Sequence, residues 1–150
     1  MTQPSLFPNG RDRSAVANID GGSRGNPGPA GYGVRISTDD GTVIELKEPL
    51  GIATNNIAEY NALLAALRWA IDHGLGALRV RSDSELLVRQ MNGEYKVRNS
   101  GLLPLHQEAR ALARRIGQVT FEHVRRELNK DADRLANEAM DEAAKSNSEV

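Results

Sequence analysis

Apolar and polar residues follow two periods along the 150-residue chain, and together they predict an ordered series of strands and helices. Short apolar or alternating runs, typical of strands, occupy residues 15–20, 31–37, 42–49, 78–82 and 119–125. Apolar residues recur at spacings of three and four, typical of helices, in residues 54–73, 84–91, 103–116 and 130–144. The order of these elements predicts an α/β fold, with a mixed five-stranded sheet and helices on both faces.

Glycine, proline and capping residues separate these runs. Residues 21–30 are rich in Gly and Pro, as a loop after the first strand would be. The sequence Asp39-Asp40-Gly41 is typical of a hairpin turn. Thr54 or Asn55 can cap the first long helix, and Gly74 is placed to end it. The boundaries between elements are therefore marked by residues with suitable backbone preferences.

The length of the chain is suited to one domain with one core. Residues 1–14 contain Pro and Gly among polar residues, and we expect a flexible N-terminal arm there. The domain itself should cover residues 15–145, and residues 146–150 should form a frayed C-terminal tail.

Composition and charge narrow the class of protein. Hydrophobic residues make up 39% and charged residues 26%, as in soluble globular domains. The net charge is −1, so any surface for nucleic acid must be a local patch. The absence of cysteine excludes disulfides and Cys-ligated metals, and no apolar run has the length of a membrane span or a signal peptide. We therefore expect a cytoplasmic protein without an obligate protein partner, most simply a monomer.

Four acidic residues stand at the ends or starts of predicted elements. Asp20 and Asp83 each follow an apolar strand, whereas Glu59 and Asp133 lie near the starts of two helices. If the two strands are neighbours, their carboxylates crowd together and repel one another unless a cation lies between them. Oxygen ligands without sulfur suit Mg²⁺ or Mn²⁺. The pattern predicts a metal-dependent site for phosphoryl transfer.

Four motifs, taken together, resemble those of type 1 ribonuclease H. They are Ile19–Gly28 (IDGGSRGNPG), Thr54–Glu59 (TNNIAE), Ser82–Ser84 (SDS) and Asn129–Ala136 (NKDADRLA). They occur in the order found in the family, and the similarity covers about residues 15–143. The resemblance implies a ribonuclease H-like sheet with strand order 3-2-1-4-5. It also implies endonucleolytic cleavage of the RNA strand of an RNA–DNA hybrid, which leaves 5′-phosphate and 3′-hydroxyl ends.

The resemblance assigns metal binding and catalysis to Asp20, Glu59, Asp83 and Asp133. It implies two Mg²⁺ ions, for which Mn²⁺ is a candidate substitute. Two such ions, about 3.5–4 Å apart, can activate a water, relieve charge on the phosphoryl oxygens and stabilise the leaving oxygen. Asp20 is the candidate to bridge both ions, with Asp83 and Glu59 at one ion and Asp133 at the other.

The same resemblance implies residues that contact the substrate. Asn26, Asn55 and Asn56 fall where the family reads RNA 2′-hydroxyls, and Thr54 falls where it contacts a phosphate of the DNA strand. An amide offers both a donor and an acceptor, which suits a hydroxyl and a minor-groove base edge. Without the resemblance, Asn26 would be interpreted as a turn residue, and Asn55 and Asn56 as candidates for helix capping.

Two segments depart from the family pattern, and the first concerns affinity for the substrate. Many members carry a basic, aromatic protrusion, but the corresponding segment here, residues 92–101, is too short for an additional helix and loop. Lys96 and Arg98 are the candidate substrate-binding cations of this segment, with a solvated surface charge as the alternative for each. Binding of the hybrid should therefore be modest and sensitive to salt.

The second departure concerns a catalytic histidine. The family has a flexible loop with a His before the last helix, whereas residues 122–129 lead almost directly from strand to helix. His123 lies within the strand pattern, and we expect it to be structural. Arg126 is the candidate for a catalytic role, because it precedes the helix that carries Asp133, and Arg125 is the rival.

Three functions are compatible with these residues. The leading one is a ribonuclease specific for RNA–DNA hybrids. The alternatives are a non-catalytic nucleic-acid-binding domain of the same fold and a related metal-dependent nuclease that acts on DNA. Four acids argue against a pure binder of a polyanion, because they would repel it. The asparagines favour RNA as the substrate over DNA.

Overall fold

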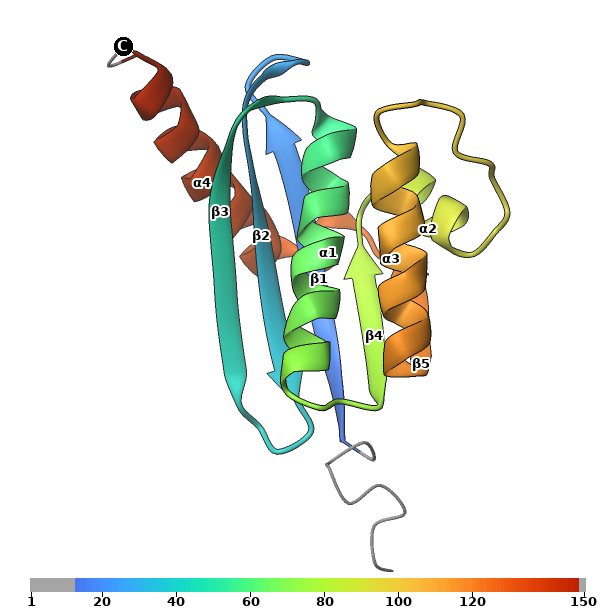
Figure 1. Ribbon diagram of the computed structural model, residues 1–150. Helices are drawn as coiled ribbons and strands as arrows, with labels where there is room; N and C mark the ends of the chain where they lie inside the picture. Colours follow the sequence, from blue (N-terminus) through green and yellow to red (C-terminus); the bar gives the residue numbers. More distant parts are fainter. Residues whose placement is uncertain (1–12, 149–150) are drawn as a thin grey trace, which may run out of the picture.

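The computed structural model describes residues 13–148, which contain one five-stranded sheet (Figure 1). The strands are β1 (Ser14–Ser23), β2 (Gly28–Thr38), β3 (Val43–Ala53), β4 (Ala77–Ser82) and β5 (Gln118–His123). Their order is β3-β2-β1-β4-β5, with β1–β2 and β2–β3 antiparallel and β1–β4 and β4–β5 parallel. The predicted strand order and the mixed sheet are confirmed.

The helices lie in two layers. They are α1 (Asn55–Asp72), α2 (Glu85–Met91), α3 (Leu103–Ile116) and α4 (Lys130–Ser148), with a short 3₁₀ helix η1 (Arg126–Leu128) before α4. Figure 1 shows α1 and α3 on one face of the sheet and α4 on the other. Within residues 13–148, no helix has the length and apolarity that crossing a bilayer requires.

Several boundaries differ from those predicted. β1 runs to Ser23 and β2 begins at Gly28, both within the predicted loop of residues 21–30, and β3 continues to Ala53. β1 begins at Ser14, within the predicted arm, and the Ser14 N–H donates to Asp39 Oδ2 at 3.2 Å. β5 ends at His123 and not at Arg125, because the chain turns there into η1. α4 continues to Ser148, so the tail predicted from residue 146 is helical at its start. Residues 1–12 of the predicted arm and residues 149–150 lie outside the described residues.

The core lies between the sheet and α1. Alternate residues of β1 and β2, such as Ile19, Val34 and Ile36, are buried against α1 residues such as Leu63 and Leu67, and all five are at most 1% exposed. The intervening residues of β1 are half-buried, and Gly31 and Gly33 of β2 lie against α4. Because side chains alternate between faces, this packing fixes which residues of β1 point toward α4.

Two glycines bring helices close to the strand that carries Asp20. A Cβ added to Gly21 would lie 2.4 Å from the carbonyl carbon of Ala58 and 2.5 Å from the backbone N of Glu59 in α1. A Cβ added to Gly33, which is opposite Asp20 in β2, would lie 2.6 Å from the backbone O of Ala132 in α4. Such contacts are too short for any side chain, so glycine at both positions permits α1 and α4 to approach the sheet.

Candidate active site

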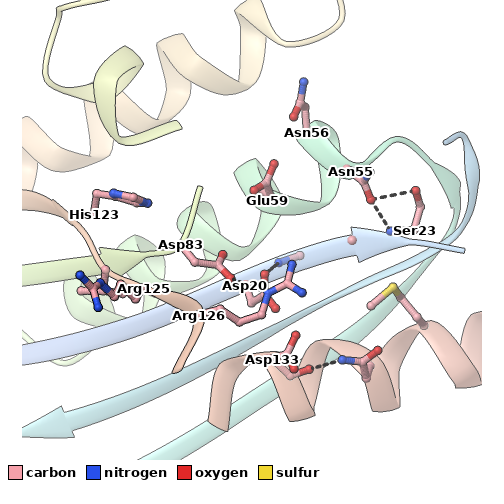
Figure 2. A pocket seen from close by; sticks show the side chains of 15 residues that line it. Asp20, Ser23, Asn55, Asn56, Glu59, Asp83, His123, Arg125, Arg126 and Asp133 are labelled. Atoms are coloured by element: carbon pink, nitrogen blue, oxygen red, sulfur yellow. Dashed lines mark hydrogen bonds and ion pairs between the residues drawn. The ribbon is translucent and has the colours of Figure 1, made fainter. Parts of the chain in front are cut away.

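The four predicted acids line one pocket of about 670 Å³ (Figure 2), which we call the acid pocket. β1 and β4 pair in parallel up to Ile19 and Ser82, so Asp20 and Asp83 follow the last paired residues of two neighbouring strands. β1 itself continues to Ser23 as the partner of β2, and Asp20 therefore lies inside the strand and not at its end as predicted.

The other two acids come from helices on opposite faces of the sheet. Glu59 belongs to the second turn of α1, and Asp133 belongs to the first turn of α4. The close approach at Gly21 and Gly33 brings both helices to Asp20. Four separate elements thus place one carboxylate each around a common space, as Figure 2 shows.

Burial and mutual repulsion make these carboxylates hard to ionise. Burial, followed by the charge of Asp83 and a side-chain hydrogen bond with Asp133, raises the pKa of Asp20 to about 8. Burial also raises the pKa of Glu59 to about 7, although a hydrogen bond with Ser84 opposes the shift. The pKa of Asp83 is raised by burial and lowered in part by Arg126. Shifts of this kind concentrate where several like charges share a poorly solvated site.

The donor set of the acid pocket fits a hard divalent cation. Its potential ligands are carboxylate oxygens, and a cation would favour the ionised form that burial disfavours. Among residues 13–148, no three His, Asp or Glu side chains already form a converged ion site. The four acids instead line the walls of an open pocket, and any bound ion would be held by their oxygens from different sides.

Arg126 forms an ion pair with one of the four acids, Asp83. Its Nε lies 3.7 Å from Asp83 Oδ2, and its side chain is 81% exposed while that of Asp83 is 15% exposed. Arg125 also lines the pocket, but it has no ion pair with an acid in the part of the chain that the structure describes. The geometry favours Arg126 over Arg125, and the catalytic role of Arg126 stays a prediction.

His123 lies closer to the acids than its place in a strand suggested. It is the last residue of β5 and pairs with Ser82, the residue before Asp83. Its side chain is exposed and lines the acid pocket, so it does not pack as a structural strand residue (Figure 2). Its proximity lowers the pKa of Asp83 slightly.

The loop after β1 is tied to the start of α1 through two of the predicted asparagines. The Oδ1 of Asn55 accepts hydrogen bonds from the Ser23 N–H at 2.8 Å and from Ser23 Oγ at 3.1 Å. The Oδ1 of Asn26 accepts from the Asn55 N–H at 3.0 Å. Backbone N–H groups can only donate, so these contacts fix the orientation of both amides. Their NH₂ groups are therefore the parts that remain for a substrate.

Thr54 and Asn56 have separate roles at the same helix end. Thr54 is the N-cap of α1, and its Oγ1 accepts from the Ile57 N–H at 3.2 Å. Asn56 is exposed and lines the acid pocket. Of the alternatives left open by the sequence, the capping residue is Thr54, and the side chain of Asn56 is available at the rim of the pocket.

The predicted basic residues lie away from the acids. Lys96 and Arg98 belong to the α2–α3 connection (residues 92–102), are exposed, and are not among the residues that line the acid pocket. In the same connection, the ring of Tyr95 lies 5.3 Å from the guanidinium carbon of Arg89. If Lys96 and Arg98 bind substrate, they contact it at a distance from the reacting bond.

Several further residues of the site were not predicted. Ser23 anchors Asn55, and Asn137 lines the pocket one helical turn after Asp133, where its Nδ2 donates to the Asp133 carbonyl at 2.9 Å. The spacing of four residues after Asp133 was the signal that could have indicated Asn137. Met140 lines the same wall one turn further along α4.

A mixed sheet of order 3-2-1-4-5, with carboxylates at the ends of the β1–β4 pairing, is the architecture of ribonuclease H-like proteins. Residues 18–139 match the family model described as "Reverse transcriptase-like", and this range contains all four acids. The chain belongs to this family, and within it to the compact type 1 ribonucleases H.

Relatives with known structures agree in sequence and in fold. The bifunctional protein Rv2228c of Mycobacterium tuberculosis is 49% identical over 133 residues, covering 87% of this chain and 36% of that protein. Its N-terminal RNase H domain, solved as a fusion with maltose binding protein, superposes with a TM-score of 0.85 at 50% identity, covering 89% of this chain and 97% of that one. LC11-RNase H1, solved in complex with RNA/DNA hybrid, superposes with a TM-score of 0.80 at 41% identity. The match covers 86% of this chain and 98% of that one.

An archaeal relative extends the comparison. Ribonuclease HI of Halobacterium salinarum is 44% identical over 128 residues, covering 85% of this chain and 64% of that protein. The chain thus spans about a third of the mycobacterial protein and less than two thirds of the archaeal one. The shared region is the domain that carries the acid pocket.

Proposed function

We propose that this protein is an endoribonuclease that hydrolyses the RNA strand of RNA–DNA hybrids and leaves 5′-phosphate and 3′-hydroxyl ends. The observation that carries the proposal is the acid pocket, in which carboxylates from β1, from α1, from the residue after β4 and from α4 line one space. The 41% identity to LC11-RNase H1, whose structure contains RNA/DNA hybrid, supports the choice of substrate.

In this proposal, the four acids hold two Mg²⁺ ions, or Mn²⁺ in their place, when the enzyme is loaded. The ions supply activation of water and stabilisation of charge on the phosphoryl and leaving oxygens. Asp20 lies among the other three carboxylates, so it would help to hold the ions together with Glu59, Asp83 and Asp133. Arg126 would hold a phosphoryl or product oxygen by its guanidinium group, since an arginine cannot act as a base in proteins.

The substrate strand would be recognised at the start of α1. Asn26 and Asn55 already use their amide oxygens for the loop, so each would donate its NH₂ group to a 2′-hydroxyl or to a base acceptor. Asn56 is exposed and can both donate and accept. Thr54, as the helix cap, would present the first turn of α1 to a DNA-strand phosphate.

The test is a cleavage assay with three labelled duplexes: RNA–DNA hybrid, RNA–RNA and DNA–DNA. Each is incubated with Mg²⁺, Mn²⁺ or chelator, with the Asp83→Asn variant as the control for contaminating nucleases. Metal-dependent cleavage of the RNA strand of the hybrid is the expected result. Binding of hybrid without cleavage would support the non-catalytic alternative, and cleavage of the DNA duplex would support the related DNA nuclease. A monomeric state and a cytoplasmic location stay predictions of the sequence.

A further inference from the structure

Two asparagine side chains join the strand that carries Asp20 to the helix that carries Asp133. Asn129 lies directly before α4 and is only 1% exposed. Its Nδ2 donates to the Ile19 carbonyl at 2.9 Å, and its Oδ1 accepts from Asn18 Nδ2 at 3.0 Å. A carbonyl can only accept, so Ile19 fixes the orientation of the Asn129 amide and leaves its oxygen for the donor from Asn18. We call these side chains the Asn18–Asn129 amide pair.

The backbone of Asn129 is bonded on both sides as well. Its N–H donates to the Arg126 carbonyl at 2.9 Å and closes η1, and its carbonyl accepts from the Asp133 N–H at 3.0 Å in the first turn of α4. Asn129 is therefore connected to the residue before Asp20, to Arg126 and to Asp133. A buried amide with all these partners has one favourable position, because any shift leaves polar groups unpaired.

We propose that the Asn18–Asn129 amide pair is a positioning device, which sets the separation between the carboxylates of Asp20 and Asp133 and the presentation of Arg126. Neither asparagine is among the residues that line the acid pocket, so the pair acts through the backbone of its neighbours. Its effect on turnover rests on the proposed function, whereas its effect on ion binding does not require a substrate.

The physical reason is the precision that a shared ion demands. Carboxylates that bind one ion from two elements must be held to a fraction of an ångström, and the surrounding hydrogen bonds provide that restraint. Asp20 belongs to a strand and Asp133 to a helix. The hydrogen bond from Asn129 to the Ile19 carbonyl joins these two elements, although the two residues are 110 positions apart in the sequence. The close packing at Gly33 limits how near α4 can approach the sheet, and it is a contact without directional bonds. The directional bonds of the amide pair oppose sliding of α4 along the sheet.

The first experiment measures Mn²⁺ affinity of the substrate-free protein by titration calorimetry. Asn18→Ala is the primary variant, because Asn18 is half-buried and its loss leaves the core intact. Asn92→Ala is the matched control, since Asn92 Nδ2, like Asn18 Nδ2, donates to a group of another segment, here the Phe121 carbonyl at 3.3 Å on the edge strand β5. We expect roughly tenfold weaker binding for Asn18→Ala, as for other outer partners of metal ligands, and wild-type affinity for Asn92→Ala.

The second experiment compares kcat and KM on hybrid for Asn18→Ala and Asn129→Ala, at a temperature well below the melting point of each. A fall in kcat with nearly constant KM is expected, because the reacting geometry changes and the substrate contacts do not. Wild-type Mn²⁺ affinity and kcat in both variants, with only a lower melting temperature, would show that the pair is merely structural. If the wild-type protein bound Mn²⁺ but cleaved no hybrid, the proposed function would fail, and the Mn²⁺ affinities would still decide the positioning role.

Discussion

The acid pocket and the α2–α3 connection differ in how far their charged side chains are exposed to solvent. In the pocket, Asp20 and Glu59 are half-buried and their pKa values are raised, so each charge there depends on its neighbours. In the connection, Lys96 and Arg98 are exposed and have no ion-pair partner among residues 13–148. Charges held in a poorly solvated space act strongly over short distances, whereas exposed charges are screened. We therefore expect chemistry to depend on the pocket and only a minor part of affinity to depend on the connection.

The strongest test of this contrast is Asp83→Asn. The amide has nearly the shape of the carboxylate but is a poor ligand for a hard cation, so cleavage of hybrid should be abolished while the fold is kept. Loss of one of several crowded charges should leave the melting temperature of the metal-free protein equal or higher. Circular dichroism and the cleavage assay measure the two properties, and turnover near the wild-type rate would refute the catalytic assignment of Asp83.

Replacement of Arg126 by alanine should lower kcat about tenfold or more, as when one group that stabilises transition-state charge is removed. KM should change little. Arg126→Lys should recover part of the activity, because an ammonium lacks the planar fork of the guanidinium. Steady-state kinetics with Arg125→Ala and His123→Ala as the matched variants will assign the role. If kcat is unchanged in Arg126→Ala but lowered in Arg125→Ala, the catalytic role belongs to Arg125. If kcat is lowered only in His123→Ala, the role belongs to the imidazole.

The stability of the metal-free protein should fall as pH rises. The folded-state pKa values of Asp20 and Glu59, about 8 and about 7, exceed the ordinary values of 3.8 and 4.5. At intermediate pH the folded state therefore keeps protons on these two carboxyl groups that the unfolded chain has released. The stability that results from this difference is lost progressively as the pH rises from about 4 to about 8. The free energy of unfolding in chelator should be at least about 1 kcal/mol larger at pH 5 than at pH 8.

Two comparisons isolate the contribution of the acids to that pH dependence. Asp20→Asn should flatten it, because the amide does not titrate. Added Mg²⁺ should raise the melting temperature more at pH 8 than at pH 5, since ions and protons compete for the same oxygens. Urea unfolding at several pH values measures how the free energy of unfolding depends on pH. If this dependence is unchanged in Asp20→Asn, groups other than Asp20 cause it.

At the rim of the pocket, Asn56→Ala should weaken binding of hybrid about two- to tenfold, the effect of one lost hydrogen bond. The melting temperature should stay the same, because Thr54 and not Asn56 caps α1. Fluorescence anisotropy with labelled hybrid measures the affinity. Unchanged affinity would remove Asn56 from the substrate contacts, and a lower melting temperature would show a structural role.

The smallest effect is expected in the α2–α3 connection. Replacement of Lys96 and Arg98 by Gln should weaken binding a few-fold and reduce the dependence of log Kd on log salt by at most about 0.9 for each phosphate that is no longer neutralised. kcat should not change, because neither residue lines the acid pocket. Anisotropy titrations at several salt concentrations measure the slope. A large fall in kcat would mean that the connection and the pocket are coupled more closely than their separation indicates.

The sequence predicted those parts of the molecule in which local pattern and tertiary packing agree. Alternating residues in β1 and β2 indicated strands, and the four acids were recognised from motifs that also set their elements. The end of β5 was placed too late, because Val124 is apolar and buried although it follows the strand. There the Val124 N–H donates to the Ser82 carbonyl and the chain then turns into η1.

Polar residues whose partners are distant in sequence were harder to interpret. His123 was expected to be structural, but the strand ends with it and its side chain turns to the pocket. Asn129 was recognised as part of a motif, but its role in the structure was not predicted. Nothing near it in the sequence shows that its side chain reaches Ile19 and Asn18. Local periodicity does not encode such contacts, because they depend on how separate elements meet.

The glycines at positions 21 and 33 have a consequence for attempts to make this protein more heat-resistant. Glycine inside a strand is ordinarily a weak point, and replacing it with a residue that favours strands is a standard improvement. Here an added methyl group would meet the backbone of Ala58 at 2.4 Å or that of Ala132 at 2.6 Å. The replacement would displace Glu59 in one case and Asp133 in the other. Stability engineering guided by secondary-structure preference alone would thus select, at these two positions, substitutions that disturb the site.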